Sequence, residues 1–182
     1  IIFAVDASGS SAVARLAEAK GAVELLLGEA YSRRDHVALI AFRGEGADVI
    51  LPPTRSLVQT KRRLAGLPGG GGTPLASGLK AAADLARQAQ GQGLSPSIAV
   101  LTDGRANVAL PGRNGRAAAK EDAEAMARML RAMALPIALV DTSVRPHRDL
   151  AALADALGEA YVPLPRADAR GLSSAIGQAL EV

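Results

Sequence analysis

The sequence has no cysteine and no tryptophan, and only two histidines, two tyrosines and two phenylalanines occur among its 182 residues. Without cysteine the chain forms no disulfide and no thiolate metal site, and two histidines leave little for a zinc cluster. We therefore expect any metal ion to be held by oxygen ligands. The scarcity of aromatic rings also argues against single-stranded nucleic acids, whose bases stack on such side chains.

Long hydrophobic runs are missing as well, since no apolar stretch approaches the roughly 20 residues of a membrane-spanning helix. Nothing at the start resembles a basic and apolar signal sequence. A hydrophobic content of 49% with 21% charged residues is typical of a globular protein with a sizeable core. We expect one domain over residues 1–182, located inside the cell. Because the sequence opens within a strand and without methionine, we also expect it to be a fragment of a longer chain.

The net charge of +3 and the pI of about 9.7 invite a nucleic-acid interpretation. The basic residues are nevertheless scattered in pairs such as Arg33-Arg34 and Arg62-Arg63, without a long basic tract. This distribution disfavours nucleic-acid binding.

Short strands that are apolar on both faces alternate with amphipathic helices along the chain, which predicts a mostly parallel sheet between two helical layers. The exception is a strand over 47–51, stopped by Pro52-Pro53, which we expect to pair antiparallel at an edge across a hairpin at 43–46. The fold class is thus α/β, with three layers and six strands. The other expected strands are 1–5, 36–42, 97–102, 136–140 and 160–164, and the expected helices cover 12–30, 56–64, 74–87, 126–133, 150–157 and 172–180.

Oxygen-bearing side chains follow the strands at the edge where ligands of such sheets bind. Asp6, Ser8 and Ser10 come after the first strand, Thr73 comes at a helix start, and Asp103 follows strand 97–102. Hard oxygen ligands with few carboxylates suit Mg²⁺ better than zinc or copper, and Mn²⁺ or Ca²⁺ are possible substitutes. Neutral hydroxyls leave positive charge on the ion, so an open position can accept an Asp or Glu of a partner protein.

The candidate ligands form a pattern of three parts: Asp6-x-Ser8-x-Ser10, Thr73 after a glycine loop, and Asp103-Gly104. This pattern resembles the metal-ion-dependent adhesion site of von Willebrand factor A, or integrin I, domains. The resemblance spans essentially the whole chain. It implies a Rossmann-like sheet and a Mg²⁺ surrounded by these five residues, whose last ligand is a partner carboxylate.

Four segments, 35–44, 51–56, 67–75 and 101–107, carry a narrower resemblance. Together they are similar to the C-terminal domains of magnesium chelatase D subunits. This resemblance implies a place in an ATP-dependent complex that inserts Mg²⁺ into protoporphyrin IX for chlorophyll or bacteriochlorophyll synthesis. The implied partners are the ATPase I subunit and the porphyrin-binding H subunit, in a hetero-oligomeric ring in the bacterial cytoplasm or the plastid stroma.

Each candidate ligand also has an ordinary explanation. Ser8 or Ser10 can cap the first helix, Thr73 can cap the helix that begins at Pro74, and Asp103-Gly104 can simply turn the chain. Only their combination at one edge favours a metal site.

Other functions remain as alternatives. The loop Gly69–Gly72 can cradle a phosphate, but it lacks the Lys-Ser/Thr of a P-loop. A magnesium-dependent phosphatase would use Asp6 or Ser8 and would need a general base nearby. His36 is expected at the opposite edge of the sheet, and His147 suits a solvated surface. An interaction domain of another ATPase-associated complex, such as cobalt chelatase, is a further alternative.

Three arginines, Arg105, Arg113 and Arg116, follow Asp103 in a polar loop over 105–116. We expect them to rim the metal edge and to attract an acidic partner. A solvated loop explains them equally well.

Overall fold

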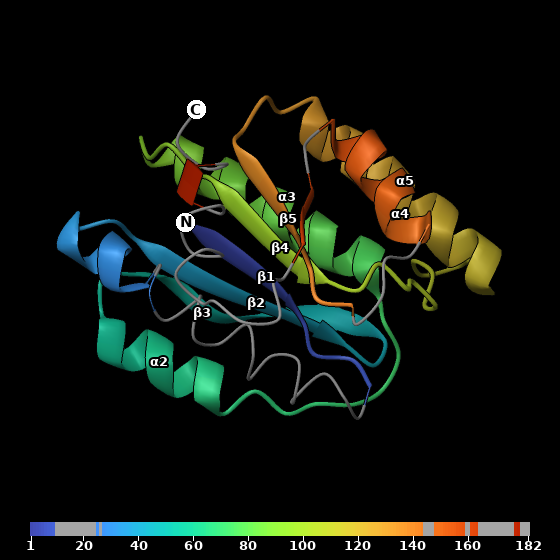
Figure 1. Cartoon of the computed structure of the whole chain (residues 1–182), viewed down its shortest axis with the longest axis horizontal. Helices are drawn as coiled ribbons and strands as arrows, with labels where there is room; N and C mark the ends of the chain where they lie inside the picture. Colours follow the sequence, from blue (N-terminus) through green and yellow to red (C-terminus); the bar gives the residue numbers. More distant parts are fainter. Residues whose placement is uncertain (10–24, 26, 144–147, 159–160, 164–176, 179–182) are drawn as a thin grey trace.

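The computed structural model describes residues 1–9, 25, 27–143, 148–158, 161–163 and 177–178. Six strands form one sheet in the order β3-β2-β1-β4-β5-β6 (Figure 1), in which β3 alone runs antiparallel to its neighbour. This confirms the predicted sheet with its antiparallel edge strand. The strands are β1 (Ile2–Asp6), β2 (Val37–Arg43), β3 (Gly46–Thr54), β4 (Ile98–Thr102), β5 (Ile137–Asp141) and β6 (Tyr161–Pro163).

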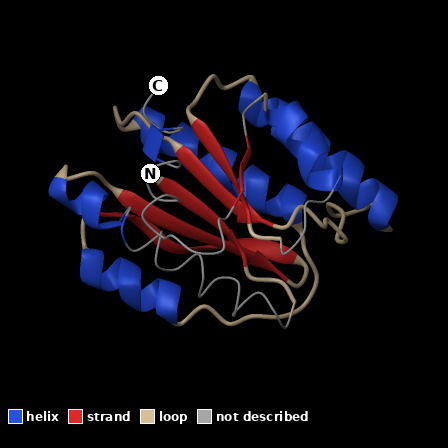
Figure 2. Cartoon of the chain, viewed as in Figure 1, coloured by secondary structure: helices blue, strands red, loops and turns tan. Residues whose placement is uncertain are grey.

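Helices lie on both faces of the sheet and produce three layers (Figure 2). Within the described residues the helices are α2 (Leu57–Ala65), α3 (Leu75–Gly91), α4 (Arg116–Arg131) and α5 (Arg148–Leu157), and residues 27–32 are also helical. Most of the helix expected over 12–30 and of the last helix expected over 172–180 lies outside the described residues. In the part of the chain that is described, no helix is long and apolar enough to cross a membrane.

The alternation of side chains along each strand divides the core into two clusters. In β1, Ile2 and Ala4 pack with α3, α4 and α5, whereas Phe3 and Val5 pack on the opposite face with Leu27 and with Leu64 of α2. Because both faces are covered, the central strands β1, β4 and β5 are apolar up to their last residue and are almost completely buried. Met126, Met129 and Met133 are partly buried and pack against the first cluster.

The structure corrects the predicted end of strand 47–51. β3 continues through Pro52 and Pro53 to Thr54, which pairs with Val37 of β2. Prolines are tolerated there because β3 is an edge strand, so their missing N–H groups remove no bond to a further strand. The register between β2 and β3 also shifts in this part of the ladder, which is where the prolines interrupt regular pairing.

Candidate metal centre

Neighbouring strands bring the predicted carboxylates to one edge of the sheet. β1 and β4 pair in parallel up to Val5 and Leu101, so both end at the same edge. Asp6 is the last residue of β1, and Asp103 follows directly after β4. Burial raises the pKa of Asp6, and the charge of Asp103 raises it further.

The Asp6 carboxylate is fixed by two donors. Its Oδ1 accepts the backbone N–H of Ser8 over 3.0 Å, and its Oδ2 accepts the hydroxyl of Thr102 over 2.8 Å. Burial is the main reason why the pKa of Asp6 is raised, while the hydrogen bonds from Ser8 and Thr102 oppose that effect. Thr102 was not predicted from the sequence, since a β-branched residue at the end of an apolar strand is indistinguishable from a core residue.

Two of the predicted hydroxyl ligands meet in the structure. Ser8 Oγ lies 2.6 Å from Thr73 Oγ1, and both residues are buried. The expected helix cap at Thr73 is wrong: α3 begins at Leu75 and its N-cap position, Pro74, makes no side-chain capping bond. Thr73 directs its hydroxyl toward Ser8 instead, because the chain enters the helix one residue later than predicted.

The glycine loop allows this approach. Gly70 N donates to the carbonyl of Ala7 over 2.9 Å, and Gly9 N donates to the carbonyl of Gly71 over 3.3 Å, so the loop is bonded to the turn after β1. Gly71 has a φ of +84°, and a Cβ there would lie 2.9 Å from Gly44 Cα. Glycine is required at this position because the backbones of the loop and of the β2–β3 hairpin touch.

A residue that the sequence analysis did not single out holds Thr73 in place. Asn107 Oδ1 accepts the backbone N–H of Thr73 over 2.7 Å. The carbonyl of Thr73 in turn accepts the backbone N–H groups of Asn107 and Val108, over 3.2 and 3.4 Å. Nothing local distinguishes Asn107 from the other polar residues of this loop, because Thr73, its partner, lies 34 residues away along the chain.

The resulting donor set fits a hard divalent cation. Two carboxylates and two hydroxyls gather at this edge, and among the described residues no three His, Cys, Asp or Glu side chains form a metal-holding group. Asp103 is 8% exposed, its Oδ1 accepts the backbone N–H of Arg105 over 3.1 Å, and Arg105 Nε lies 3.9 Å from its Oδ2. A cation between the carboxylates would relieve their mutual repulsion, and oxygen-only ligands favour Mg²⁺ over softer metals.

The remaining residues considered for the site are not among those that the structure brings together at this edge. Ser10 and His147 lie outside the described residues. Arg113 is held by its own chain, through ion pairs to Asp122 and to Glu121, and Arg116 is the exposed first residue of α4.

Asp122 of α4 anchors the loop that follows Asp103. This acid is 4% exposed and accepts both Arg113 and the backbone N–H of Leu110, the latter over 2.9 Å. The bonds tie the loop that begins at Asp103 to α4. Asp122 was not a sequence candidate, because its partners lie 9 and 12 residues away along the chain.

His36 lies at the other edge, as the sequence predicted. It precedes β2, and its carbonyl accepts the amino group of Ile1 over 2.7 Å at the amino ends of the strands. The described part of the chain therefore offers no imidazole near Asp6 or Ser8.

Comparison with known proteins identifies the family. Residues 1–105 match the family described as von Willebrand factor type A domain. The chain belongs to the von Willebrand factor type A domain family. The vWF domain of the type V pili tip protein Mfa5 from Porphyromonas gingivalis shares the fold, with a TM-score of 0.73 and 11% identity over 100% of this chain and 95% of that chain. At this identity the likeness supports the fold alone.

Among the curated relatives, this von Willebrand factor type A chain is similar to bacterial chelatase subunits. It is 64% identical to the magnesium-chelatase 60 kDa subunit of Cereibacter sphaeroides over 99% of its own length and 32% of that protein. It is 58% identical to the magnesium-chelatase 60 kDa subunit of Rhodobacter capsulatus over 100% of its length and 32% of that protein. The chain thus spans about a third of the length of these relatives. The predicted resemblance to chelatase subunits is confirmed.

Proposed function

We propose that this chain is a magnesium-dependent protein-interaction domain of a magnesium chelatase subunit. In this role it would scaffold the ATP-dependent complex that inserts Mg²⁺ into protoporphyrin IX. The substrate Mg²⁺ goes to the porphyrin, whereas the ion bound by this domain is adhesive. Identities of 64% and 58% to magnesium-chelatase 60 kDa subunits support the chelatase assignment.

The observation that carries the interaction role is the meeting of Ser8 and Thr73 hydroxyls, 2.6 Å apart, beside two carboxylates. We assign Asp6, Ser8, Ser10, Thr73 and Asp103 as the residues that hold Mg²⁺, with Mn²⁺ or Ca²⁺ as substitutes. A site with neutral hydroxyls leaves the bound ion electrophilic, so it supplies a binding point for a carboxylate.

The proposed partners are the ATPase subunit and the porphyrin-binding subunit of the chelatase, each offering an Asp or Glu side chain. Arg105 is exposed and lies beside Asp103, so it is the arginine best placed to attract such an acid. Arg113 contributes less directly, because its guanidinium is engaged by Asp122 and Glu121.

The test is retention of the two partner subunits by the immobilised full-length protein, in Mg²⁺ and in chelator, with calorimetric titration of Mg²⁺ alongside. Asp6→Ala is expected to abolish the calorimetric signal and to reduce retention by roughly tenfold or more. Asp48→Ala, which removes an exposed carboxylate from β3, is the matched control and should behave like the wild type. Retention that is unchanged both in Asp6→Ala and in chelator would contradict the proposal.

A further inference from the structure

One stretch of the chain carries basic residues and no acidic ones. Between Asp48 and Asp84 there are Arg55, Lys61, Arg62, Arg63 and Lys80, and no Asp or Glu. The chain as a whole has 21 basic and 18 acidic residues, so its positive charge originates in this stretch and the remainder is slightly acidic. Four of the five cations lie on α2 or directly before it.

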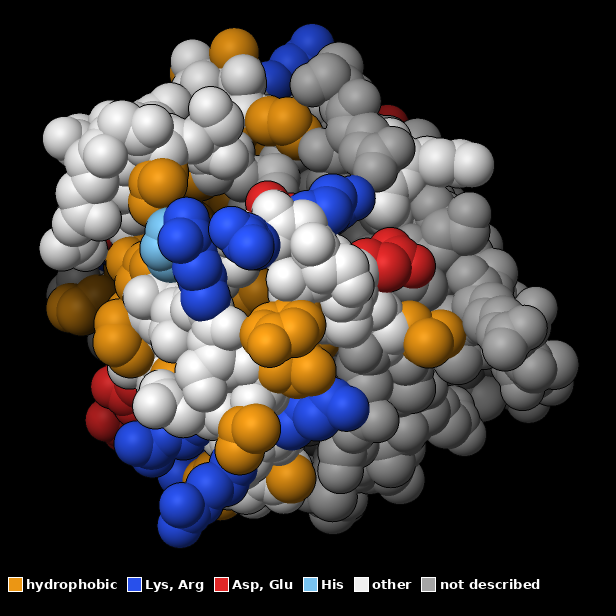
Figure 3. All heavy atoms as spheres, turned by 90° about the vertical axis from the view of Figure 1, so that its left-hand side faces the viewer, with side chains coloured by type: hydrophobic (Ala, Val, Ile, Leu, Met, Phe, Trp, Pro, Cys, Tyr) orange, Lys and Arg blue, Asp and Glu red, His pale blue; other side chains and the backbone are white. Residues whose placement is uncertain are grey.

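Basic side chains outnumber acidic ones on the face drawn in Figure 3. There Lys and Arg side chains are interspersed with hydrophobic ones and with few acidic ones. Apolar side chains are exposed nearby, with Val58 on α2 exposed to 77%. This combination of charge and apolar surface favours contact with a peptide over contact with a simple salt ion.

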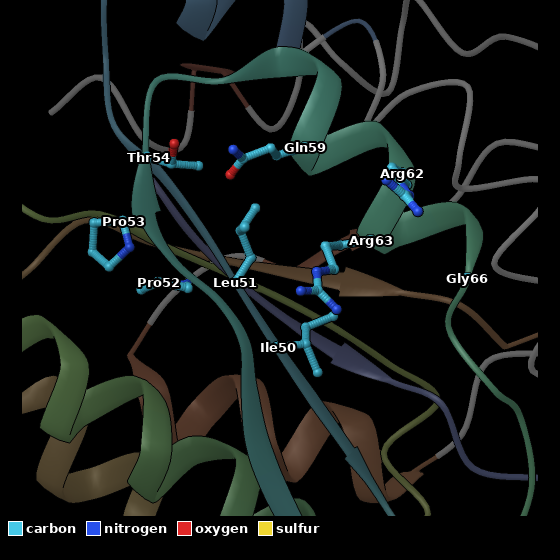
Figure 4. A pocket seen from close by; sticks show the side chains of 9 residues that line it. All are labelled: Ile50, Leu51, Pro52, Pro53, Thr54, Gln59, Arg62, Arg63 and Gly66. Carbon is cyan, nitrogen blue, oxygen red and sulfur yellow. The ribbon is translucent and has the colours of Figure 1, made fainter.

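A groove of about 800 Å³ lies between β3 and α2 (Figure 4). The strand provides the apolar wall, and the helix provides Gln59 and two arginines. In Figure 4 the Arg63 side chain extends from α2 toward the β3 wall. The lining residues are Ile50, Leu51, Pro52, Pro53, Thr54, Gln59, Arg62, Arg63 and Gly66.

The described residues that line the groove include two cations, Arg62 and Arg63, and no acidic side chain. Within the described residues, Arg62 and Arg63 form no salt bridge and no side-chain hydrogen bond, in contrast to Lys80 and Arg87 of α3, which pair with Asp84. Two exposed guanidinium groups, from consecutive residues of α2, are thus left available to carboxylates from outside the chain.

The strand wall limits how an occupant can bind. β3 is the edge of the sheet, but Pro52 and Pro53 have no N–H to offer, so a regular ladder cannot extend along this part of the strand. Recognition must therefore come from side chains: carboxylates on the arginines, and an apolar residue against Ile50 and the prolines.

We propose that the groove between β3 and α2 is a docking site for an acidic peptide segment of a partner protein, held by Arg62 and Arg63. This surface is separate from the candidate metal centre. Thr54 pairs with Val37 at the amino end of β2, whereas Asp6 pairs with Phe42 near the carboxyl end of that strand. Binding in the groove requires no metal ion.

The experiment measures fluorescence anisotropy of a short dye-labelled peptide of glutamate, leucine and proline, titrated with the full-length protein. We expect Arg62→Gln and Arg63→Gln each to weaken binding roughly threefold, and the double variant roughly tenfold. Lys61→Gln is the matched control, because Lys61 lies on the same helix and carries the same charge but does not line the groove.

Two further arms make the result specific. A peptide with lysine in place of glutamate should not bind, and binding of the acidic peptide should fall with added salt. Chelator and Asp6→Ala should leave the affinity unchanged, so failure of the metal proposal and failure of this one are distinguishable. Equal losses in Lys61→Gln and in the groove variants, or no binding by the wild type, would overturn the proposal.

Discussion

Thr73 and Asn107 hold each other by reciprocal hydrogen bonds, in which Asn107 Oδ1 accepts Thr73 N–H over 2.7 Å and Thr73 carbonyl accepts Asn107 N–H over 3.2 Å. The two residues belong to different loops, one before α3 and one after β4. The pair therefore fixes the glycine loop against the loop that carries Asp103.

Removing the Asn107 side chain should loosen this connection. In Asn107→Ala the N–H of Thr73 loses its acceptor, and we expect a loss of about 1–3 kcal/mol in the free energy of unfolding together with weaker Mg²⁺ binding. Urea denaturation and calorimetric titration measure the two effects. Asn114→Ala removes an exposed amide from the same loop and should change neither. Equal behaviour of the two variants would contradict a positioning role for Asn107.

Thr102 is expected to orient the Asp6 carboxylate. Its hydroxyl donates to Asp6 Oδ2 over 2.8 Å and accepts the backbone N–H of Gly104 over 3.1 Å, and the residue is completely buried. Thr102→Val keeps the shape but removes both bonds, so we expect about 1–3 kcal/mol lower stability and reduced affinity for Mg²⁺ in calorimetry. Thr102→Ser retains the hydroxyl and should preserve the affinity; if Ser and Val lose affinity alike, packing and not the hydroxyl is responsible.

Asp122 should matter more to stability than its neighbour Glu121, although both pair with Arg113. The Asp122 side chain is 5% exposed and also accepts the N–H of Leu110, whereas the Glu121 side chain is 66% exposed. We expect Asp122→Ala to cost about 1–3 kcal/mol by leaving Leu110 N–H without an acceptor, and Glu121→Ala to be close to neutral. Thermal and urea unfolding of the two variants test the difference, and equal losses would show that the loop is anchored elsewhere.

Most of the fold was predictable because the strands are short, apolar and separated by clear helical periodicity. The edge strand was predicted too short, since the rule that proline ends a strand depends on whether a further strand pairs there, which the sequence does not reveal. The cap at Thr73 was wrong for a related reason: a threonine followed by proline suits a helix start locally, but the Ser8 hydroxyl from another segment competes for it.

The sequence predicted the candidate ligands of the metal but not the residues that hold those ligands in place. Asp6, Ser8, Thr73 and Asp103 stand out as polar residues after apolar strands or glycines, and the structure brings them to one edge. Thr102, Asn107 and Asp122 act through contacts between segments far apart in the sequence, so their roles follow from tertiary structure alone.

The contact between Gly71 and Gly44 also has a consequence for motion. A Cβ at Gly71 would lie within 2.9 Å of Gly44, so the two backbones have no free space between them. Any shift of the Thr73 loop toward β2 must carry the β2–β3 hairpin with it. A rearrangement at the metal edge would therefore be transmitted to the hairpin as a rigid displacement.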